Sequence, residues 1–343
     1  MLKILKHNRS LIPALKANGL RVISHHEELT EEEGRLVDEY FKENVYPVLT
    51  PMAVDASRPF PLIRNKTLNI AALLSKKNTK SEKQELDFAT VQVPGVLPRL
   101  VQIPSEEENA KCFILLEQII EKNIDKLFLN YEVLCAYPYR IMRNADLTID
   151  EDEAADLLKE IQKQLKKRQW GEVIRLEVEA SVDKKLLRFL KDELKVAEED
   201  IFQISGPIDL TFLMKMYGLS GCDSLRYEPY KPQRVPEIEP GEDIFEAIRG
   251  GDILLHHPYE TFDPVVDFIR QAASDPDVLA IKQTLYRVSG NSPVVRALRR
   301  AAENGKQVTV VVELKARFDE GNNIVWARLL EASGARVVYG VAG

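Results

Sequence analysis

The stretch Gln307-Val-Thr-Val-Val-Val-Glu-Leu-Lys-Ala-Arg317 decides the fold of the carboxyl-terminal part of this chain. Three further apolar runs, Asp252–His257, Val278–Arg287 and Ala335–Gly340, alternate with it and with segments of helical period. This alternation predicts parallel strands joined by crossover helices, so that residues 252–343 form a β-α-β-α-β-α-β unit.

Two of these predicted strands end in arginine, at Arg287 and Arg317. Ligands bind at the carboxyl edge of such a sheet, where we expect the two side chains to converge. A guanidinium offers a planar fork of donors that matches phosphate oxygens, and it stays charged at any working pH. The pattern therefore indicates a phosphate-rich ligand. The alternative is that both arginines form surface ion pairs with Asp319 or Glu320.

Three ungapped blocks, Ile253–Pro264, Leu279–Arg287 and Val312–Glu320, resemble the core of the bacterial polyphosphate kinases, long-chain enzymes with a phospholipase D-like catalytic half. The match continues upstream through Tyr46–Asp55 and Phe212–Asp223, so it covers nearly the whole chain. It implies an α/β and α+β multidomain protein. In this chain we expect an α+β middle domain followed by an incomplete phospholipase D-like α/β domain with a mainly parallel sheet.

The resemblance also implies the activity, which is the reversible transfer of the terminal phosphate of ATP to polyphosphate through a phosphohistidine. That histidine is expected just after Gly343, so we expect no catalytic residue in this chain and no activity from it alone. The family's Mg²⁺ site corresponds to Arg287 and Arg317. Because a guanidinium cannot ligate a cation, the metal would be held through phosphate oxygens and water. The implied partners are ATP or ADP, inorganic polyphosphate and further copies of the chain in a homo-oligomer.

The resemblance implies three parts. Residues 1–19 resemble the end of a helical amino-terminal domain, residues 20–230 an α+β middle domain, and residues 231–343 the first phospholipase D-like catalytic domain, truncated before its catalytic histidine. Four prolines between Arg226 and Pro240 can continue neither a helix nor a central strand, so they mark the boundary to the catalytic part.

Local patterns predict several elements of the middle domain. Thr30-Glu-Glu-Glu33 resembles a capping box that opens a helix through Tyr40. Leu68–Leu74 and Phe88–Val93 are predicted to form a hairpin, and Val173–Glu179 alternates as a half-buried strand. Asp152–Arg168 has acidic residues first and basic residues last, which matches the dipole of a helix.

Composition and charge limit the class of protein. The 343 residues are 45% hydrophobic and 29% charged, enough to bury a core in about two domains. A net charge of -7 argues against a nucleic-acid binder, although a few arginines in a cleft can still attract polyphosphate. No apolar run reaches the roughly 18 residues of a membrane span. The three cysteines, Cys112, Cys135 and Cys222, lack metal-type spacing and favour a cytoplasmic protein, with a peripheral place at the inner membrane as the alternative.

Other polar candidates have simpler interpretations. His256 and His257 follow a predicted strand, but no third ligand is suitably spaced for a metal, and the family does not phosphorylate this dipeptide. His25 and His26 are expected in a solvated turn. The basic run Lys163–Arg168 is typical of a solvated helix end. Two strand lysines, Lys282 and Lys315, either line a phosphate path or serve only as polar packing residues.

Two other functions stay open. One is a phosphodiesterase or phosphatidyltransferase-like enzyme of the same fold, which the upstream blocks disfavour because such relatives lack the middle domain. The other is a non-catalytic module for polyphosphate binding and assembly, which a Lys-Thr-His motif downstream would disfavour.

Overall fold

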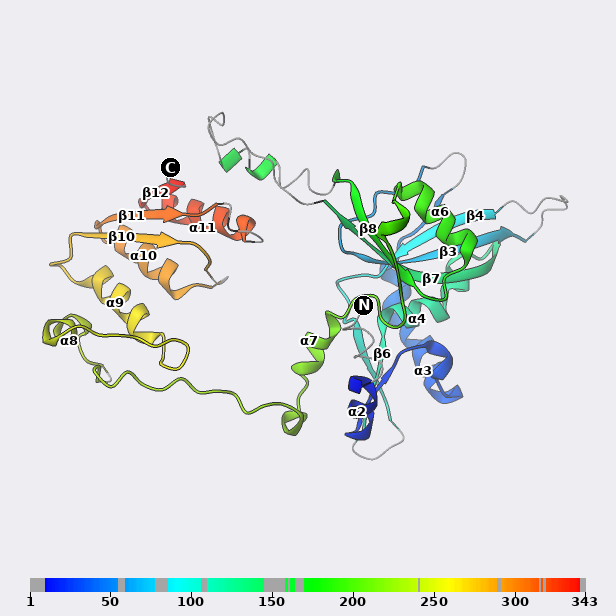
Figure 1. The fold of residues 1–343 in the computed structure, drawn as a ribbon, viewed down its shortest axis with the longest axis horizontal. Helices are drawn as coiled ribbons and strands as arrows, with labels where there is room; N and C mark the ends of the chain where they lie inside the picture. Colours follow the sequence, from blue (N-terminus) through cyan, green and yellow to red (C-terminus); the bar gives the residue numbers. More distant parts are fainter. Residues whose placement is uncertain are drawn as a thin grey trace. The chain divides into compact units, whose positions relative to one another are not determined.

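The computed structural model describes residues 10–54, 59–77, 86–105, 110–144, 158–159, 161–163, 170–239, 241–288, 291–314, 316 and 319–339. The chain forms two compact units (Figure 1). Unit 1 comprises Met1–Ala145 and Arg168–Arg226, and unit 2 comprises Asp146–Lys167 and Tyr227–Gly343. Each apolar cluster of the described residues lies within one unit, so each unit has a core of its own.

The large sheet of unit 1 has six strands in the order β2-β4-β3-β7-β8-β9. Only the β8–β9 pair is parallel. Antiparallel pairing of β3 with β4 confirms the predicted hairpin, and β8 has the predicted bounds. The strands are β2 Pro51–Val54, β3 Leu68–Lys76, β4 Leu86–Gln92, β7 Tyr131–Arg143, β8 Val173–Glu179 and β9 Ile201–Ile204.

Both faces of this sheet are covered. Along β3, Ile70 and Ala72 belong to an apolar cluster with Ile119 of α4 (Leu116–Lys122). Ala71 belongs instead to a cluster with Leu186 of α6 (Lys184–Leu194). This alternation follows from the two-residue period of a strand. The large sheet therefore lies between helices, with α6 (Lys184–Leu194) on one face and α4 (Leu116–Lys122) on the other.

A second sheet of unit 1 has the order β1-β6-β5, with β1 Leu20–Ile23, β5 Leu100–Ile103 and β6 Lys111–Leu115. The other α-helices of the unit are α2 Ile12–Ala17, α3 Glu31–Tyr40 and α7 Phe212–Tyr217. The Thr30 hydroxyl accepts from the Glu33 amide over 3.2 Å, and the Glu33 carboxylate accepts from the Thr30 amide over 2.9 Å. This reciprocal pair confirms the predicted capping box.

Unit 2 contains a parallel sheet in the order β10-β11-β12, with β10 Ala280–Leu285, β11 Gln307–Val312 and β12 Arg336–Tyr339. Its helices are α8 Ile244–Gly250, α9 Asp263–Ser274, α10 Pro293–Glu303 and α11 Glu320–Ala332. Because both crossovers step in the same direction, their right-handedness puts α10 and α11 on one face. Val308, Val310 and Val312 face these helices and form the core with them.

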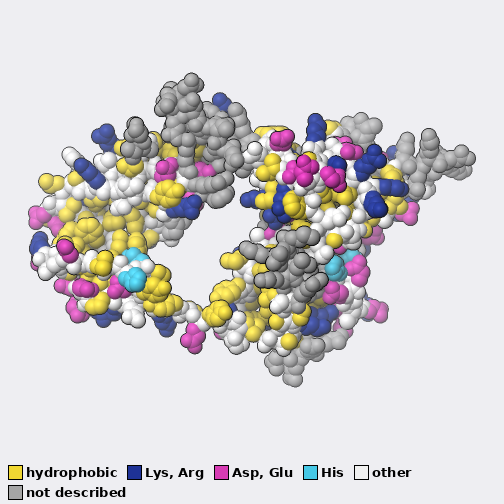
Figure 2. Space-filling view, viewed as in Figure 1, with side chains coloured by type: hydrophobic (Ala, Val, Ile, Leu, Met, Phe, Trp, Pro, Cys, Tyr) yellow, Lys and Arg dark blue, Asp and Glu magenta, His cyan; other side chains and the backbone are white. Residues whose placement is uncertain are grey.

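The opposite face of this sheet is more open. It carries Ala280, Lys282, Thr284, Thr309, Val311, Arg336 and Val338. Among the described residues, none of its apolar side chains belongs to the unit 2 core. Figure 2 shows hydrophobic side chains gathered on the surface of unit 2, and Leu254 and Leu279 are among the most exposed, at 87% and 79%.

A short helical segment between β7 and β8 in the chain belongs to unit 2. Residues 158–159 and 161–163 are helical, and Ile161 is fully buried in the unit 2 core. Gln162 accepts a hydrogen bond from Arg328 Nη2 of α11 over 3.1 Å. The remaining residues of the predicted helix Asp152–Arg168 lie outside the described part of the chain.

The prediction that Asp252–His257 is a strand is wrong. These residues form no strand in the structure, and β10 pairs only with β11 on the described sheet. The nearest β-bridge joins Gln233 to Glu260. An apolar run becomes a strand only where a neighbouring strand offers its hydrogen-bonding groups, and local sequence cannot specify that neighbour. None of the helices in the described ranges has both the length and the apolar character needed to cross a membrane.

Candidate functional site

The carboxyl ends of β10 and β11 lie side by side. Leu285 and Val312, the last residues of these strands, are register partners, and the Glu313 amide donates to the Leu285 carbonyl over 3.1 Å. The loops that carry Arg287 and Arg317 therefore start from neighbouring points. Arg317 lies outside the described residues, so the convergence of the two guanidinium groups stays a prediction.

Arg287 is held at this edge by a carboxylate. Its Nε lies 3.1 Å from Oδ2 of Asp319, and its side chain is 53% exposed. The ion pair suggested by the sequence as an alternative is therefore formed with Asp319. Since a guanidinium carries five N–H donors, this contact is compatible with a phosphate contact on the same side chain.

The amino-terminal turn of α11 joins the two strand ends. Asn323 is 1% exposed, and its Nδ2 donates to the Tyr286 carbonyl over 2.8 Å and to the Glu313 carbonyl over 2.7 Å. The helix itself begins directly after Asp319. One helix turn thus contacts the side chain of Arg287 and the backbone beside it.

Two helix amino termini are directed to the same edge, because α10 follows β10 and α11 follows β11. The Ser292 hydroxyl caps α10 by accepting from the Val295 amide over 3.4 Å. Helix amino termini carry partial positive charge and unpaired N–H groups, which favour anions. Together with Arg287, these helix termini are the features of this edge that favour an anionic ligand.

The two histidine pairs make local contacts. The His256 amide donates to Glu260 Oε2 over 2.7 Å, and His257 Nδ1 lies 3.2 Å from the Glu260 carbonyl oxygen. His25 begins a short 3-10 turn, and the His26 amide donates to Gln118 Oε1 over 2.9 Å. The turn in unit 1 is therefore tied to α4.

The remaining sequence candidates contribute no described contact at the sheet edge. Lys282 is exposed on the open face of β10, and Lys315 lies outside the described residues. Of Lys163–Arg168 only Lys163 is described. Burial raises the pKa of the Cys112 and Cys135 thiols. The described residues include no group of three or more His, Cys, Asp or Glu that could hold a metal ion.

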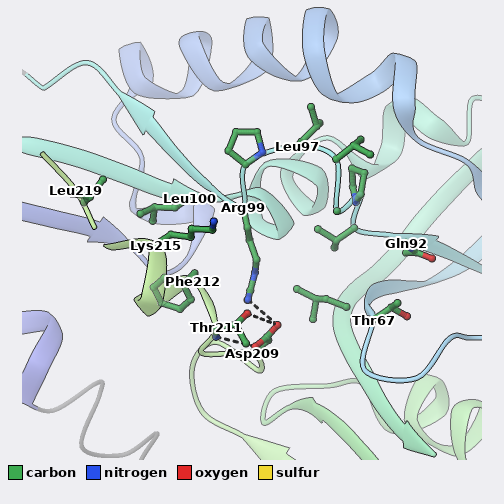
Figure 3. A pocket seen from close by; sticks show the side chains of 16 residues that line it. Thr67, Gln92, Leu97, Arg99, Leu100, Asp209, Thr211, Phe212, Lys215 and Leu219 are labelled. Atoms are coloured by element: carbon green, nitrogen blue, oxygen red, sulfur yellow. Dashed lines mark hydrogen bonds and ion pairs between the residues drawn. The ribbon is translucent and has the colours of Figure 1, made fainter. Parts of the chain in front are cut away.

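Unit 1 contains a separate pocket of about 710 Å³ between the segment Gln92–Leu100 and α7. Figure 3 shows Arg99 directed toward Asp209, with Phe212 and Lys215 beside it. The Arg99 guanidinium donates to both Glu117 oxygens, over 3.0 and 2.6 Å. Its positive charge is therefore already neutralised.

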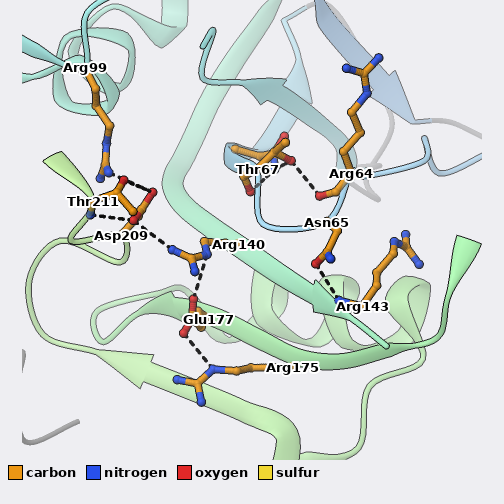
Figure 4. Close-up of polar contacts among 11 residues, drawn as sticks. Arg64, Asn65, Thr67, Arg99, Arg140, Arg143, Arg175, Glu177, Asp209 and Thr211 are labelled. Carbon is orange, nitrogen blue, oxygen red and sulfur yellow. Dashed lines mark hydrogen bonds and ion pairs between the residues drawn. The ribbon is translucent and has the colours of Figure 1, made fainter. Parts of the chain in front are cut away.

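The same arginine belongs to a longer network of ion pairs (Figure 4). Asp209 lies 3.1 Å from both Arg99 Nη1 and Arg140 Nη1. Glu177 in turn lies 3.4 Å from Arg140 Nε and 2.8 Å from Arg175 Nε. With acidic and basic members in balance, the network is suited to joining elements of unit 1 rather than to attracting an anion.

Sequence reasoning missed Asn323 and this network. A signal for Asn323 was present, because it continues the buried stripe of Ala327 and Leu330 at helical spacing. A polar residue on such a stripe must find internal partners. No comparable signal marks Asp209 and Glu177, which are far apart in the chain.

Two family models match the chain. The model described as Polyphosphate kinase middle domain matches residues 32–216, and the model described as Polyphosphate kinase C-terminal domain 1 matches residues 243–343. The polyphosphate kinase of Bacillus anthracis is 50% identical over 335 residues, which cover 97% of this chain and 47% of that protein. The polyphosphate kinase of Exiguobacterium sibiricum is 52% identical over 335 residues, which cover 97% and 46%.

The fold has a counterpart in the crystal structure of polyphosphate kinase from Porphyromonas gingivalis. The TM-score is 0.76 at 28% identity, over 99% of this chain and 48% of that chain. This match confirms the predicted α/β and α+β multidomain fold. The chain spans about half the length of the curated relatives it matches. Since the middle-domain match alone covers more than half of the sequence, the chain belongs to the polyphosphate kinase family.

Proposed function

We propose that this chain is the phosphate-holding part of a polyphosphate kinase, which transfers the terminal phosphate of ATP reversibly to inorganic polyphosphate. Family membership supports the reaction. The observation that carries the site is Arg287, a half-exposed cation at the carboxyl edge of a parallel sheet, beside the amino terminus of α11. Ligands bind at this edge in open α/β sheets.

Binding and orientation are the roles of this chain in the reaction. Arg287 and Arg317 bind the oxygens of the phosphoryl group that is being transferred, because positioning and electrostatic stabilisation dominate phosphoryl transfer. Asp319 orients the Arg287 guanidinium through its contact with Nε.

Mg²⁺ is the metal that the family implies, and it supplies charge neutralisation at phosphate oxygens. The described residues provide no ligand cluster for it, and Asp319 is engaged by Arg287. We therefore propose that Mg²⁺ would bind through the phosphate oxygens of the substrate and not through side chains of this edge.

The proposal includes the domain plan and the setting. We propose that residues 1–19 belong to the end of a helical domain, residues 20–230 to the middle domain and residues 231–343 to the first catalytic domain. The segment around Ile161 is the exception, because its side chain lies in the core of unit 2. The protein acts in the cytoplasm as a homo-oligomer on ATP or ADP and polyphosphate, with no nucleic-acid partner.

Calorimetric titration with tripolyphosphate tests the site. Arg287→Lys should weaken binding about tenfold or more, because a lysine ammonium cannot reproduce bidentate contacts worth roughly 1.5 to 3 kcal/mol. Arg300→Lys is the matched control, since Arg300 is exposed near the opposite end of α10. The affinity of the Arg300→Lys variant for tripolyphosphate should stay within about twofold of the wild-type value. No binding by the wild-type chain, or equal behaviour of the two variants, would overturn the proposed site.

A further inference from the structure

Asn323 is the most informative polar residue of unit 2. It lies in the first turns of α11 with 1% exposure, on the same stripe as the buried Ala327 and Leu330. Burying an amide without partners is costly, so its place in an apolar stripe requires an explanation. The structure provides one, because its Nδ2 makes two hydrogen bonds with good distances, 2.8 and 2.7 Å.

The two acceptors are the carbonyl groups of Tyr286 and Glu313, the first residues after β10 and β11. Beyond a strand end, the sheet no longer fixes the path of the backbone. Here the side-chain amide of Asn323 binds the backbone just after β10 and the backbone just after β11, and it attaches both to the start of α11. The direction in which each loop leaves the sheet therefore depends on Asn323.

Arg287 directly follows one of these acceptors. Its backbone is fixed through Tyr286 by Asn323, and its guanidinium is fixed by Asp319 at 3.1 Å. The backbone N–H of Asn323 in turn donates to the Asp319 carbonyl over 2.9 Å. Both ends of the arginine are thus attached to the same helix turn, and a shift of this turn displaces the cation as a whole.

We propose that Asn323 is a positioning residue for the phosphate site, which sets the place of Arg287 by clamping the ends of β10 and β11. The inference rests on the proposed function as far as the ligand is concerned. Phosphate binding depends steeply on donor placement, since a bidentate contact needs both N–H groups aligned with the oxygens. Loss of the clamp should therefore reduce affinity while every phosphate-contacting side chain is retained.

Asn323→Ser tests the clamp, because a hydroxyl is shorter and can donate only one hydrogen bond. Tripolyphosphate should bind at least about tenfold more weakly to this variant than to the wild type. Leu330→Ala is the stability control, since Leu330 is fully buried in the last turns of the same helix, away from the carboxyl edge. It should lower the melting temperature at least as much and change the affinity by less than about twofold.

A second readout needs no ligand. The Arg287 Nε–H signal in a two-dimensional ¹⁵N–¹H NMR spectrum reports the contact with Asp319. It should shift toward the position of a solvated arginine in Asn323→Ser and keep its wild-type position in Leu330→Ala. If Asn323→Ser is poorly folded, Asn323→Asp, which keeps the shape but replaces the donor with an oxygen, is measured in the same way.

The outcomes are distinguishable. Wild-type affinity together with an unmoved Arg287 signal in Asn323→Ser would overturn the positioning role. Equal loss of affinity in Leu330→Ala would reduce Asn323 to a contributor to stability and would also overturn it. Absence of tripolyphosphate binding in the wild type would refute the proposed function, while a shifted Arg287 signal in Asn323→Ser would still support the clamp.

Discussion

The two units bury their strands in different ways. β3 of unit 1 has strand neighbours on both sides and apolar clusters on both faces, and eight of its nine residues are buried. In the described sheet of unit 2, β10 has one neighbouring strand and one packed face, and only Leu285 of its six residues is buried. Among the described residues, β3 is therefore packed on both faces and paired along both edges, whereas β10 has one unpacked face and one unpaired edge.

The difference suggests that unit 1 provides more of the stability of the protein and that unit 2 carries the candidate site. Hydrophobic stabilisation grows with the apolar area removed from water, so we expect unit 1 to be the more stable part. The candidate phosphate site lies at the carboxyl edge of the less enclosed sheet, where loops leave the strands. Elements that bind ligands commonly belong to the less stable parts of a protein. The following predictions test this contrast.

The largest effect is expected in the ion-pair network of unit 1. Glu177 has a side chain only 9% exposed, and Glu177→Ala leaves Arg140 and Arg175 without their shared carboxylate. Breaking a buried pair by removing one partner costs about 3 to 5 kcal/mol. The unit 1 transition in urea should shift accordingly. Asp192→Ala, which removes an exposed partner of Arg188, should cost about 0.5 kcal/mol or less. Similar shifts in the two variants would contradict the structural role of the network.

The next effect concerns the segment that lies between two strands of unit 1 but belongs to unit 2. Ile161→Ala removes a fully buried side chain from the unit 2 core and should cost about 2 to 5 kcal/mol in the unit 2 transition. Val325→Ala, on the half-exposed side of α11, should stay within about 0.5 kcal/mol. Because Trp170 lies in unit 1, the melt is followed by tryptophan fluorescence in a Trp170→Phe background, where Trp326 reports on unit 2 alone. If Ile161→Ala shifted only the unit 1 transition, the assignment of the segment would be wrong.

The pH dependence of unit 1 should reveal Glu121. Burial, together with the neighbouring carboxylates of Glu179 and Glu27, raises its pKa to about 8 from the ordinary value of 4.5. Between these two values the folded state keeps a proton that the unfolded state has lost. This contribution to stability therefore falls as pH rises and levels off above about pH 8. Between pH 5 and pH 8.5 the urea midpoint should change less in Glu121→Gln than in the wild type. An unchanged pH profile in that variant would rule out this proton.

The smallest effects should be equal in the two units. Thr30→Ala and Ser292→Ala each remove a side-chain cap from a helix, and each should cost about 1 kcal/mol. Capping is a local interaction, so it should not follow the difference in enclosure. Thermal melts of both variants check this expectation, and a cost several times larger in one unit would show that its cap has a tertiary role.

Much of the fold was predictable because its signals are local. The capping box at Thr30 needs only residues three apart, and the strand Val173–Glu179 follows from alternation along seven residues. The parallel strands β10 and β11 follow from apolar runs separated by a helical segment. In the candidate site, the sequence singled out Arg287 and named Asp319 as a possible partner of its ion pair, which the structure shows at 3.1 Å.

The sequence by itself therefore determined α3, the strands β3, β4, β8, β10, β11 and β12 with the helices between the last three, and which cation follows β10. Only the tertiary structure decided that Asp252–His257 pairs with none of the described strands, that Ile161 lies in the core of unit 2, and that Asn323 joins two strand ends. The physical reason is the range of the interactions. Period and capping act within a few residues, whereas ladder partners, buried contacts and ion pairs such as Asp209 with Arg99 exist only after folding brings distant residues together.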